Sequence, residues 1–195
     1  MEFFLLGNDV ASYCVHKFLI LLLETVQIGT PPQNVKTFLS TASTETWAVA
    51  PEGCIPDIDP ADCTKTRGRI YNYNISTSWI PNLANTSNQV YKLGLEDRLG
   101  YTGLGRYGFD SVTLGFIGDG GPSLSNQTVA SISTTDFWLG NFGVNPRPTN
   151  FTSFNDPIPS FMGNLRNQNM IPSTSWSYTA GNRYRMSTPY PTDIH

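Results

Sequence analysis

Hydroxyl-bearing side chains dominate the segment Ser40–Ser43, which directly follows an apolar run. A serine hydroxyl is not a base near neutral pH, and it becomes a nucleophile only when a neighbouring base takes its proton. The two histidines of the chain, His16 and His195, lie near its ends and far from this segment in sequence. The segment therefore does not predict a serine nucleophile paired with a histidine base.

A second chemical feature is the pair Cys54 and Cys63, which brackets a short loop rich in proline and aspartate. In an oxidising compartment a disulfide would hold such a loop, and we predict one here. The alternatives are two free thiols or, more weakly, a metal site, for which no suitably spaced histidine is present. We expect no metal and no cofactor. The third cysteine, Cys14, belongs to the N-terminal segment.

The chain also contains four Asn-X-Ser/Thr sequons without proline at the middle position. The four asparagines are Asn74, Asn85, Asn126 and Asn150. Together with the cysteine pair they favour passage through a secretory pathway and predict glycosylation. The alternative is that a composition rich in Asn, Ser and Thr generates unused sequons.

Composition limits the class of protein. The chain has 195 residues, of which 39% are hydrophobic, 12% aromatic and only 14% charged. This is ordinary for one globular domain or lobe, and a surface made polar by neutral groups suits a secreted β protein. The net charge of −3 provides no basic surface for a phosphate backbone, so nucleic acid is not expected as a partner.

Short apolar or β-branched runs alternate with turn residues from Thr25 onward, which predicts an all-β barrel or sandwich. The expected strands are Thr25–Ile28, Asn34–Leu39, Thr46–Ala50, Val90–Leu95, Ser111–Leu114, Thr128–Thr134 and Phe137–Leu139. One helix is predicted over Ser160–Asn169. Ser160 can cap its N-terminus, and Phe161, Met162 and Leu165 can share a face.

The first two of these strands resemble the N-terminal lobe of the pepsin-like aspartic proteases. That family has an Ile-Gly-Thr-Pro-Pro-Gln turn, then an apolar residue before Asp-Thr-Gly-Ser, and then a tryptophan. This chain has Val26–Val35, then Phe38–Ser43, and then Trp47. At the position of the catalytic aspartate the resemblance places Ser40, followed by Thr41, Ala42 and Ser43.

The resemblance runs from about Thr25 to Arg185 and implies a pepsin-like lobe of the double-ψ barrel type. It implies that Tyr101 is the flap tyrosine of a substrate cleft, and that the Phe137–Val144 segment crosses beneath the Ser40 loop. The other matching segments are Arg67–Tyr71, Ser76–Trp79, Tyr101–Val112 and Pro159–Ile171, while Ile171–Ser173 and Ser177–Gly181 are similar to fungal members, some of which also have a Ser-Thr-Ala box.

Aspartic proteases activate water between two carboxylates that share a proton. The resemblance therefore implies that no catalytic residue is intact in this chain. Ser40 cannot act as the general base, and nothing after Arg185 resembles a second aspartate box. We expect Asp110 to have a structural role and Glu45 to face solvent in a loop.

These considerations divide the chain into an uncertain segment (residues 1–24), a pepsin-like lobe (25–185) and a divergent tail (186–195). In the first segment the apolar cluster Phe18–Leu23 is too short to span a bilayer. As a signal peptide it lacks a basic start and a cleavage site. A signal or anchor, an aberrant translated start and a first strand packed on the lobe are the open interpretations.

Three functions remain open. The first is a proteolytically inactive, one-lobed aspartic-peptidase-like protein that retains peptide binding. The second is an active fungal aspartic endopeptidase with a damaged gene model, and the third is a non-enzymatic secreted or cell-wall glycoprotein. For the first we expect an extracellular or cell-surface location, a peptide or protein ligand, and self-association through an exposed interlobe face.

Overall fold

The protein is described here from a computed structural model, which covers residues 3–5, 23–54, 62–82, 91–96, 101–134, 137–149 and 157–178. For residues 3–5, 23, 91–96, 101, 102 and 176–178 we describe the backbone alone. The strands are β1 (Phe3–Leu5), β2 (Leu23–Ile28), β3 (Gln33–Ser40), β4 (Thr46–Val49), β5 (Ile80–Pro81), β6 (Tyr91–Glu96), β7 (Tyr101–Leu114), β8 (Ser123–Ile132), β9 (Gly140–Gly143) and β10 (Trp176–Tyr178). The α-helices are α1 (Cys63–Thr66) and α2 (Phe161–Asn167), and the 3-10 turns are η1 (Pro51–Gly53) and η2 (Tyr73–Ile75).

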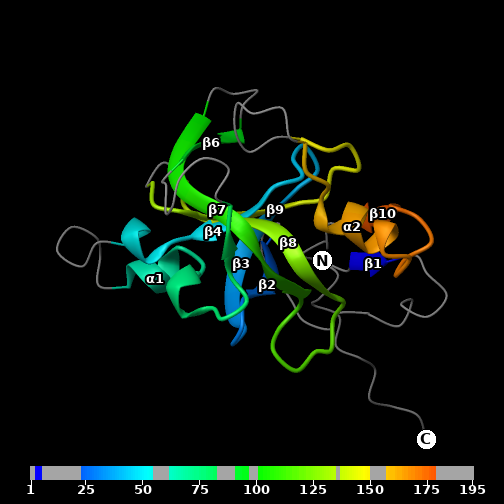
Figure 1. The fold of residues 1–195 in the computed structure, drawn as a ribbon, viewed down its shortest axis with the longest axis horizontal. Coiled ribbons are helices and arrows are strands. Elements are labelled where there is room, and N and C mark those ends of the chain that lie inside the picture. Colours follow the sequence, from blue (N-terminus) through cyan, green and yellow to red (C-terminus); the bar gives the residue numbers. More distant parts are fainter. Residues whose placement is uncertain are drawn as a thin grey trace, which may run out of the picture.

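Six strands close into a barrel in the order β2-β3-β9-β4-β8-β7. The barrel closes because β2 pairs with β7 as well as with β3. Two pairings, β3 with β9 and β4 with β8, are parallel, and the others around the barrel are antiparallel. The all-β prediction is confirmed at this level, and Figure 1 shows α1 and α2 on opposite sides of the barrel.

Burial alternates along β3, the strand that the sequence predicts over Asn34–Leu39. Val35, Thr37 and Leu39 are buried, whereas Lys36 and Phe38 are exposed, as expected for a strand with one face toward a core. The predicted strands over residues 25–28, 34–39, 46–50 and 90–95 match β2, β3, β4 and β6 to within two residues.

Three strand predictions were wrong in their extent. The strand predicted over Thr128–Thr134 corresponds to β8, which begins at Ser123 and ends at Ile132. The sequence predicted a strand only over residues 111–114, but β7 begins at Tyr101 and runs for 14 residues. Gly103, Gly105 and Gly108 lower its intrinsic strand propensity, and pairing with β6, β8 and β5 overrides that preference. At Gly108 a Cβ atom would lie 2.9 Å from the Cα of Pro81, so the glycine allows β5 to approach.

The strand predicted over Phe137–Leu139 was also wrong, since β9 is Gly140–Gly143. All four residues of β9 are buried between β3 and β4. In that position strand neighbours on both sides supply the pairing. Strand propensity favours the apolar residues Phe137–Leu139 over the Gly-Asn-Phe-Gly of β9, so the strand was predicted just before its actual position.

Helix α2 packs against the barrel through three fully buried side chains, Phe161, Met162 and Leu165. The predicted cap is confirmed, because the Ser160 hydroxyl accepts a hydrogen bond from the Gly163 N–H at 3.2 Å. Phe161 also contacts Phe142 of β9, with ring centroids 5.4 Å apart. The helix thus covers the end of the core that includes β9.

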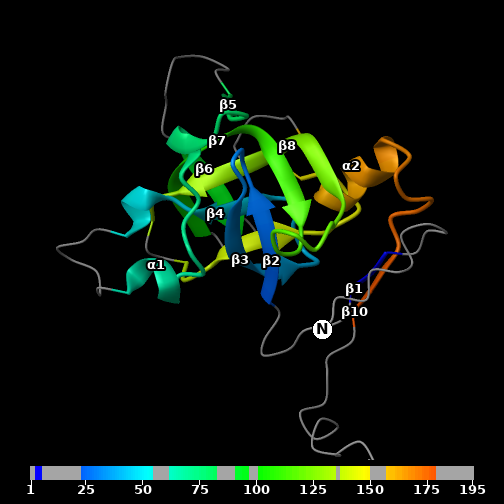
Figure 2. The same cartoon turned by 90° about the horizontal axis from the view of Figure 1, so that it is seen from below.

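Beside α2, β1 pairs with β10 in a separate two-stranded antiparallel sheet (Figure 2). Within the described residues no helix has the length and apolar character needed to cross a membrane. Residues 6–22, including Cys14, His16 and all of the apolar cluster except Leu23, lie outside the described residues, as does the predicted tail 186–195.

Candidate functional site

The Ser40 loop, residues 40–45, connects β3 to β4 and crosses over β9. Ser40 is paired in register with Gly143 on one side of β9, and Thr46 is paired with Phe142 on the other. The two strands that the loop joins are therefore separated by a strand that follows about 100 residues later. From the sequence we expected the segment Phe137–Val144 to cross beneath this loop. Within that segment, residues 140–143 form the strand β9 that does so.

The loop is bonded to β9 and to the residues just after it. The Val144 N–H donates to the Ser40 carbonyl at 2.8 Å, and the Gly143 N–H donates to the Glu45 carbonyl at 3.0 Å. Asn141 Nδ2 donates to Ser43 Oγ at 2.9 Å and to the Glu45 carbonyl at 2.7 Å. These bonds fix the loop conformation at both of its ends.

Gly143 permits this close crossing. A Cβ atom there would lie 2.5 Å from the Thr44 carbonyl carbon and 2.6 Å from both the Ser43 oxygen and the Glu45 nitrogen. Real Cβ atoms do not come this close to backbone, so any other residue would push the loop outward. Within Gly140–Gly143, then, the second glycine determines how tightly the loop lies on the barrel.

Ser40 itself is half-buried, and its Oγ accepts a hydrogen bond from the Ser43 N–H at 3.3 Å. The next two residues, Thr41 and Ala42, are exposed at the tip of the loop, whereas Ser43 is buried. The Ser40 hydroxyl thus helps to close the turn. Neither histidine falls within the described residues, so no histidine contact is described for Ser40.

The expectation that Glu45 faces solvent was wrong, because its side chain is only 4% exposed. Oε1 accepts a hydrogen bond from the Thr149 hydroxyl at 2.6 Å, and Oε2 accepts one from the Thr44 N–H at 3.1 Å. Burial raises the pKa of Glu45, and the hydrogen bonds, led by that of Thr149, oppose the rise. The carboxyl turns inward because donors from the loop and from residue 149 satisfy it there.

Asp110 has the structural role that the sequence analysis expected. It is buried, and its carboxylate accepts from the Tyr71 hydroxyl at 2.5 Å, the Ser78 hydroxyl at 2.5 Å and the Ser111 N–H at 2.7 Å. Burial of Tyr71 raises the pKa of its hydroxyl, and both the hydrogen bond from Tyr71 to Asp110 and the negative charge of Asp110 add to the rise. All of these donors are part of the fold, so Asp110 ties β7 to residues 71–78.

Tyr101 is the first residue of β7 and is paired in register with Glu96 of β6. It therefore lies next to the connection 97–100 of the predicted flap hairpin, and that connection is outside the described residues. The backbone arrangement brings β6 and β7 together as a hairpin. The side chain of Tyr101 is not described, so its role as a cleft residue stays a prediction.

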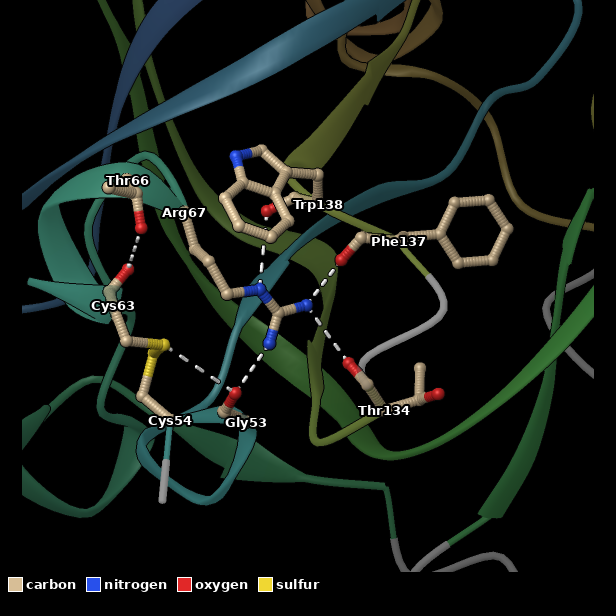
Figure 3. The surroundings of a disulfide bond; sticks show 8 residues. All are labelled: Gly53, Cys54, Cys63, Thr66, Arg67, Thr134, Phe137 and Trp138. Atoms are coloured by element: carbon tan, nitrogen blue, oxygen red, sulfur yellow. Dashed lines mark hydrogen bonds between the residues drawn. A yellow bond between two sulfur atoms is a disulfide. The ribbon is translucent and has the colours of Figure 1, made fainter. Parts of the chain in front are cut away.

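The predicted disulfide between Cys54 and Cys63 is present, with an S–S distance of 2.04 Å. It is consistent with folding in an oxidising compartment. Beside it the buried guanidinium of Arg67 donates to four main-chain carbonyls, as Figure 3 shows. These belong to Gly53 at 2.5 Å, Thr134 at 3.0 Å, Trp138 at 3.3 Å and Phe137.

Sequence reasoning missed Arg67, Asn141 and Thr149. Arg67 precedes Gly68, whose φ of 74° marks a turn that directs the chain past the disulfide. Asn141 is a polar residue between buried neighbours, a pattern that signals a buried hydrogen-bonding role. Thr149 has no comparable sequence signal, because its contact with Glu45 spans 104 residues.

Two of the four predicted glycosylation sites, Asn74 and Asn126, are described, and both side chains are exposed. Asn85 and Asn150 lie outside the described residues. Comparison with protein-family models and with curated proteins gave no match for this chain.

Proposed function

We propose that this chain is a pepsin-like, aspartic-peptidase-type lobe that does not hydrolyse peptides and has kept the ability to bind them. The observation that carries the proposal is the position of β9 between β3 and β4, directly beneath the loop that begins at Ser40. The resemblance of the sequence places the catalytic aspartate of that family at the start of this loop.

The contacts of the loop support the absence of hydrolysis. Ser40 offers a hydroxyl where the reaction needs a carboxylate, and that hydroxyl accepts the Ser43 N–H. The nearest carboxyl in sequence, Glu45, is buried and bonded to Thr149 and Thr44. Asp110 is held by Tyr71, Ser78 and Ser111. Neither acid is free to replace the missing base.

Peptide binding is the part of the proposal that rests on the hairpin of β6 and β7. This hairpin corresponds to the flap in the resemblance, and Tyr101 lies next to its connection. The loop tip at Thr41 and Ala42 is exposed and can contact a ligand. We also propose that the protein is extracellular or on the cell surface, which the disulfide and the exposed sequons support.

Hydrolysis is tested with a fluorogenic peptide library at acidic pH, with and without a statine-type inhibitor. We expect no inhibitor-sensitive turnover by the wild-type chain or by its Ser40→Ala variant. Ser40→Asp, alone and with Ala42→Gly, restores the family sequence at the loop, and Ser40→Asn is the matched uncharged control. Wild-type turnover that the inhibitor blocks and Ser40→Ala abolishes would overturn the proposal of an inactive lobe.

Peptide binding is tested by fluorescence anisotropy with a labelled statine-type peptide. Tyr101→Ala should weaken binding at least fivefold, whereas Phe116→Ser, at an exposed residue of the β7–β8 turn, should not change it. The absence of saturable binding to the wild-type chain, or equal binding by both variants, would contradict a ligand site at the hairpin.

A further inference from the structure

We propose that Asn126 carries an Asn-linked glycan and that transfer must precede the incorporation of β8 into the barrel. The sequon Asn126-Gln127-Thr128 lies within β8, and the Asn126 side chain is exposed. This inference is independent of the peptidase-like proposal, since it concerns a different strand and a different chemistry.

A β-bulge directs Asn126 outward. Across β7 and β8, Asp110 is paired with Gln127 and Val112 with Leu124, so two residues of β8, Ser125 and Asn126, oppose Ser111 alone. Asn126 has φ of 59°, in the left-handed region that asparagine adopts more readily than most residues. The extra residue leaves the ladder and presents its side chain to solvent. The folded barrel can therefore accommodate a bulky group on Asn126.

The rest of the sequon has the opposite environment. Thr128 is only 6% exposed and is paired with Phe109 of β7, and Gln127 is 1% exposed. The Gln127 side chain accepts a hydrogen bond from Asn164 of α2 at 2.7 Å. A transferase that must reach both the asparagine amide and the threonine hydroxyl cannot do so once these contacts have formed. Folding thus removes the acceptor site without covering Asn126 itself.

The co-substrate would be an oligosaccharide attached to a polyprenol diphosphate. The side-chain amide nitrogen of Asn126 forms a bond to the anomeric carbon of the first sugar and loses one proton. The bond between that carbon and the diphosphate oxygen breaks, and the polyprenol diphosphate leaves with the electron pair. No oxidant or reductant is needed.

Asn74 provides an internal comparison. Its sequon lies in the surface turn η2, where the Ser76 hydroxyl accepts a hydrogen bond from the Thr30 N–H at 3.0 Å. Several hydrogen bonds hold this turn, but Asn74 and Ile75 are exposed and Ser76 is half-buried, whereas Gln127 and Thr128 are buried in a barrel strand. Folding should therefore protect the Asn74 sequon less than the Asn126 sequon.

Occupancy is tested by secreting the full chain, behind a secretion signal of the host, from a eukaryotic cell that attaches N-glycans. Glycopeptide mass spectrometry should find most secreted molecules modified at Asn126. Asn126→Asp keeps a residue that tolerates the left-handed conformation, and Thr128→Val keeps Asn126 itself; both should abolish modification there. A predominantly bare Asn126 in the secreted wild-type chain overturns the proposal, and so does modification at residue 126 in the Thr128→Val variant.

Timing is tested with unglycosylated chain made in bacteria and incubated with a purified transferase and its lipid-linked donor. The folded wild-type chain should be modified at Asn126 at least tenfold more slowly than the Ile132→Asp variant, whose charge at a fully buried position prevents the barrel from closing. The same ratio should be smaller at Asn74. Equal rates at Asn126 in the two chains would overturn the order of events.

Discussion

At the scale of single residues, the Ser40 hydroxyl and the Glu45 carboxyl lie in the same loop but in different environments. Ser40 has a half-exposed hydroxyl that closes the turn, while Glu45 has the only described carboxyl within the loop and is held beneath it. The acid is thus present but bonded inside the fold. The loop keeps a defined conformation without a carboxylate at its start.

Buried acids should make stability depend on pH. Burial raises the pKa of Glu24 to about 7 from an ordinary 4.5, and it also raises that of Glu45. Between these values the Glu24 carboxyl keeps its proton in the folded protein and loses it in the unfolded chain, so rising pH favours unfolding, and the raised pKa of Glu45 acts in the same direction. The free energy of unfolding should therefore fall as pH rises from 4.5 to 7.

Urea unfolding at several pH values measures this slope. Glu24→Gln and Glu45→Gln should each flatten it, because the substituted side chain cannot ionise. Phe116→Ser, at an exposed residue that does not ionise, is the control and should leave the slope unchanged. If the free energy of unfolding of the wild-type protein instead rose from pH 4.5 to 7, this would contradict raised pKa values for Glu24 and Glu45.

The sequence predicted the position of the Ser40 loop and the disulfide, but it did not predict the orientation of Glu45. A charged residue next to a turn normally faces water, and the donor that reverses this is Thr149, more than 100 residues away. Such a partner cannot be found from local pattern. The structural role of Asp110 was expected from the resemblance of residues 101–112 to the family, although the predicted strand began only at Ser111.

At the scale of elements, the contact between the loop and β9 depends on Gly143. Gly143→Ala should lower the free energy of unfolding by about 2–3 kcal/mol, because the added methyl group meets backbone that cannot move aside cheaply. Thermal or urea unfolding measures the loss. Gly163→Ala in α2 is the control and should change stability by less than about 1 kcal/mol. Similar small effects at both glycines would mean that the loop is not held against β9.

Arg67 and the disulfide hold the same segment by different means. Loss of the disulfide, with its sequence separation of 9, should cost about 2–3 kcal/mol. Arg67→Met should cost about 3 kcal/mol, because buried carbonyls lose their donors. Since each can hold Gly53 near residues 63–67 when the other is absent, the combined loss should exceed the sum by about 1 kcal/mol.

A double-mutant cycle of Arg67→Met with Cys54→Ser/Cys63→Ser, followed by urea unfolding, measures this coupling. Arg147→Met, at an exposed arginine, should change neither stability nor the effect of removing the disulfide. Strict additivity of Arg67→Met with loss of the disulfide would show that the two act on separate parts of the structure.

Among the elements, β3, which has apolar and β-branched residues and lies between turn residues, was predicted closely, while β7 and β9 were not. In both, glycines occupy positions where another chain segment approaches, at Gly108 and Gly143. Single-sequence propensity counts these glycines against a strand. In the structure, however, Gly108 allows β5 to approach and Gly143 allows the Ser40 loop to approach. These approaches depend on strand pairing in three dimensions and cannot be inferred from local sequence.

At the scale of the whole molecule, this chain should associate with itself when it is prepared alone. Several large apolar side chains are exposed, among them Leu104, Phe116, Ile117 and Trp138, and apolar patches that a partner normally covers promote association. Sedimentation should give an average mass that rises with protein concentration. Leu104→Ser, at one of these exposed apolar residues, should weaken association, whereas Ser125→Arg, on the bulge of β8, should not. A monomer at all concentrations with one reversible unfolding transition would contradict this expectation.

The position of β9 also determines how the chain can be divided. A chain that ends before Gly140 contains β3 and β4 but not the strand between them, so it exposes two unpaired strand edges instead of forming a smaller barrel. Such a fragment is prone to aggregate. The same fragment has a vacant strand position between β3 and β4, which a synthetic peptide covering residues 137–145 can occupy. This barrel is therefore suited to reconstitution from two pieces, whereas a barrel built only from successive hairpins has no such vacant central position.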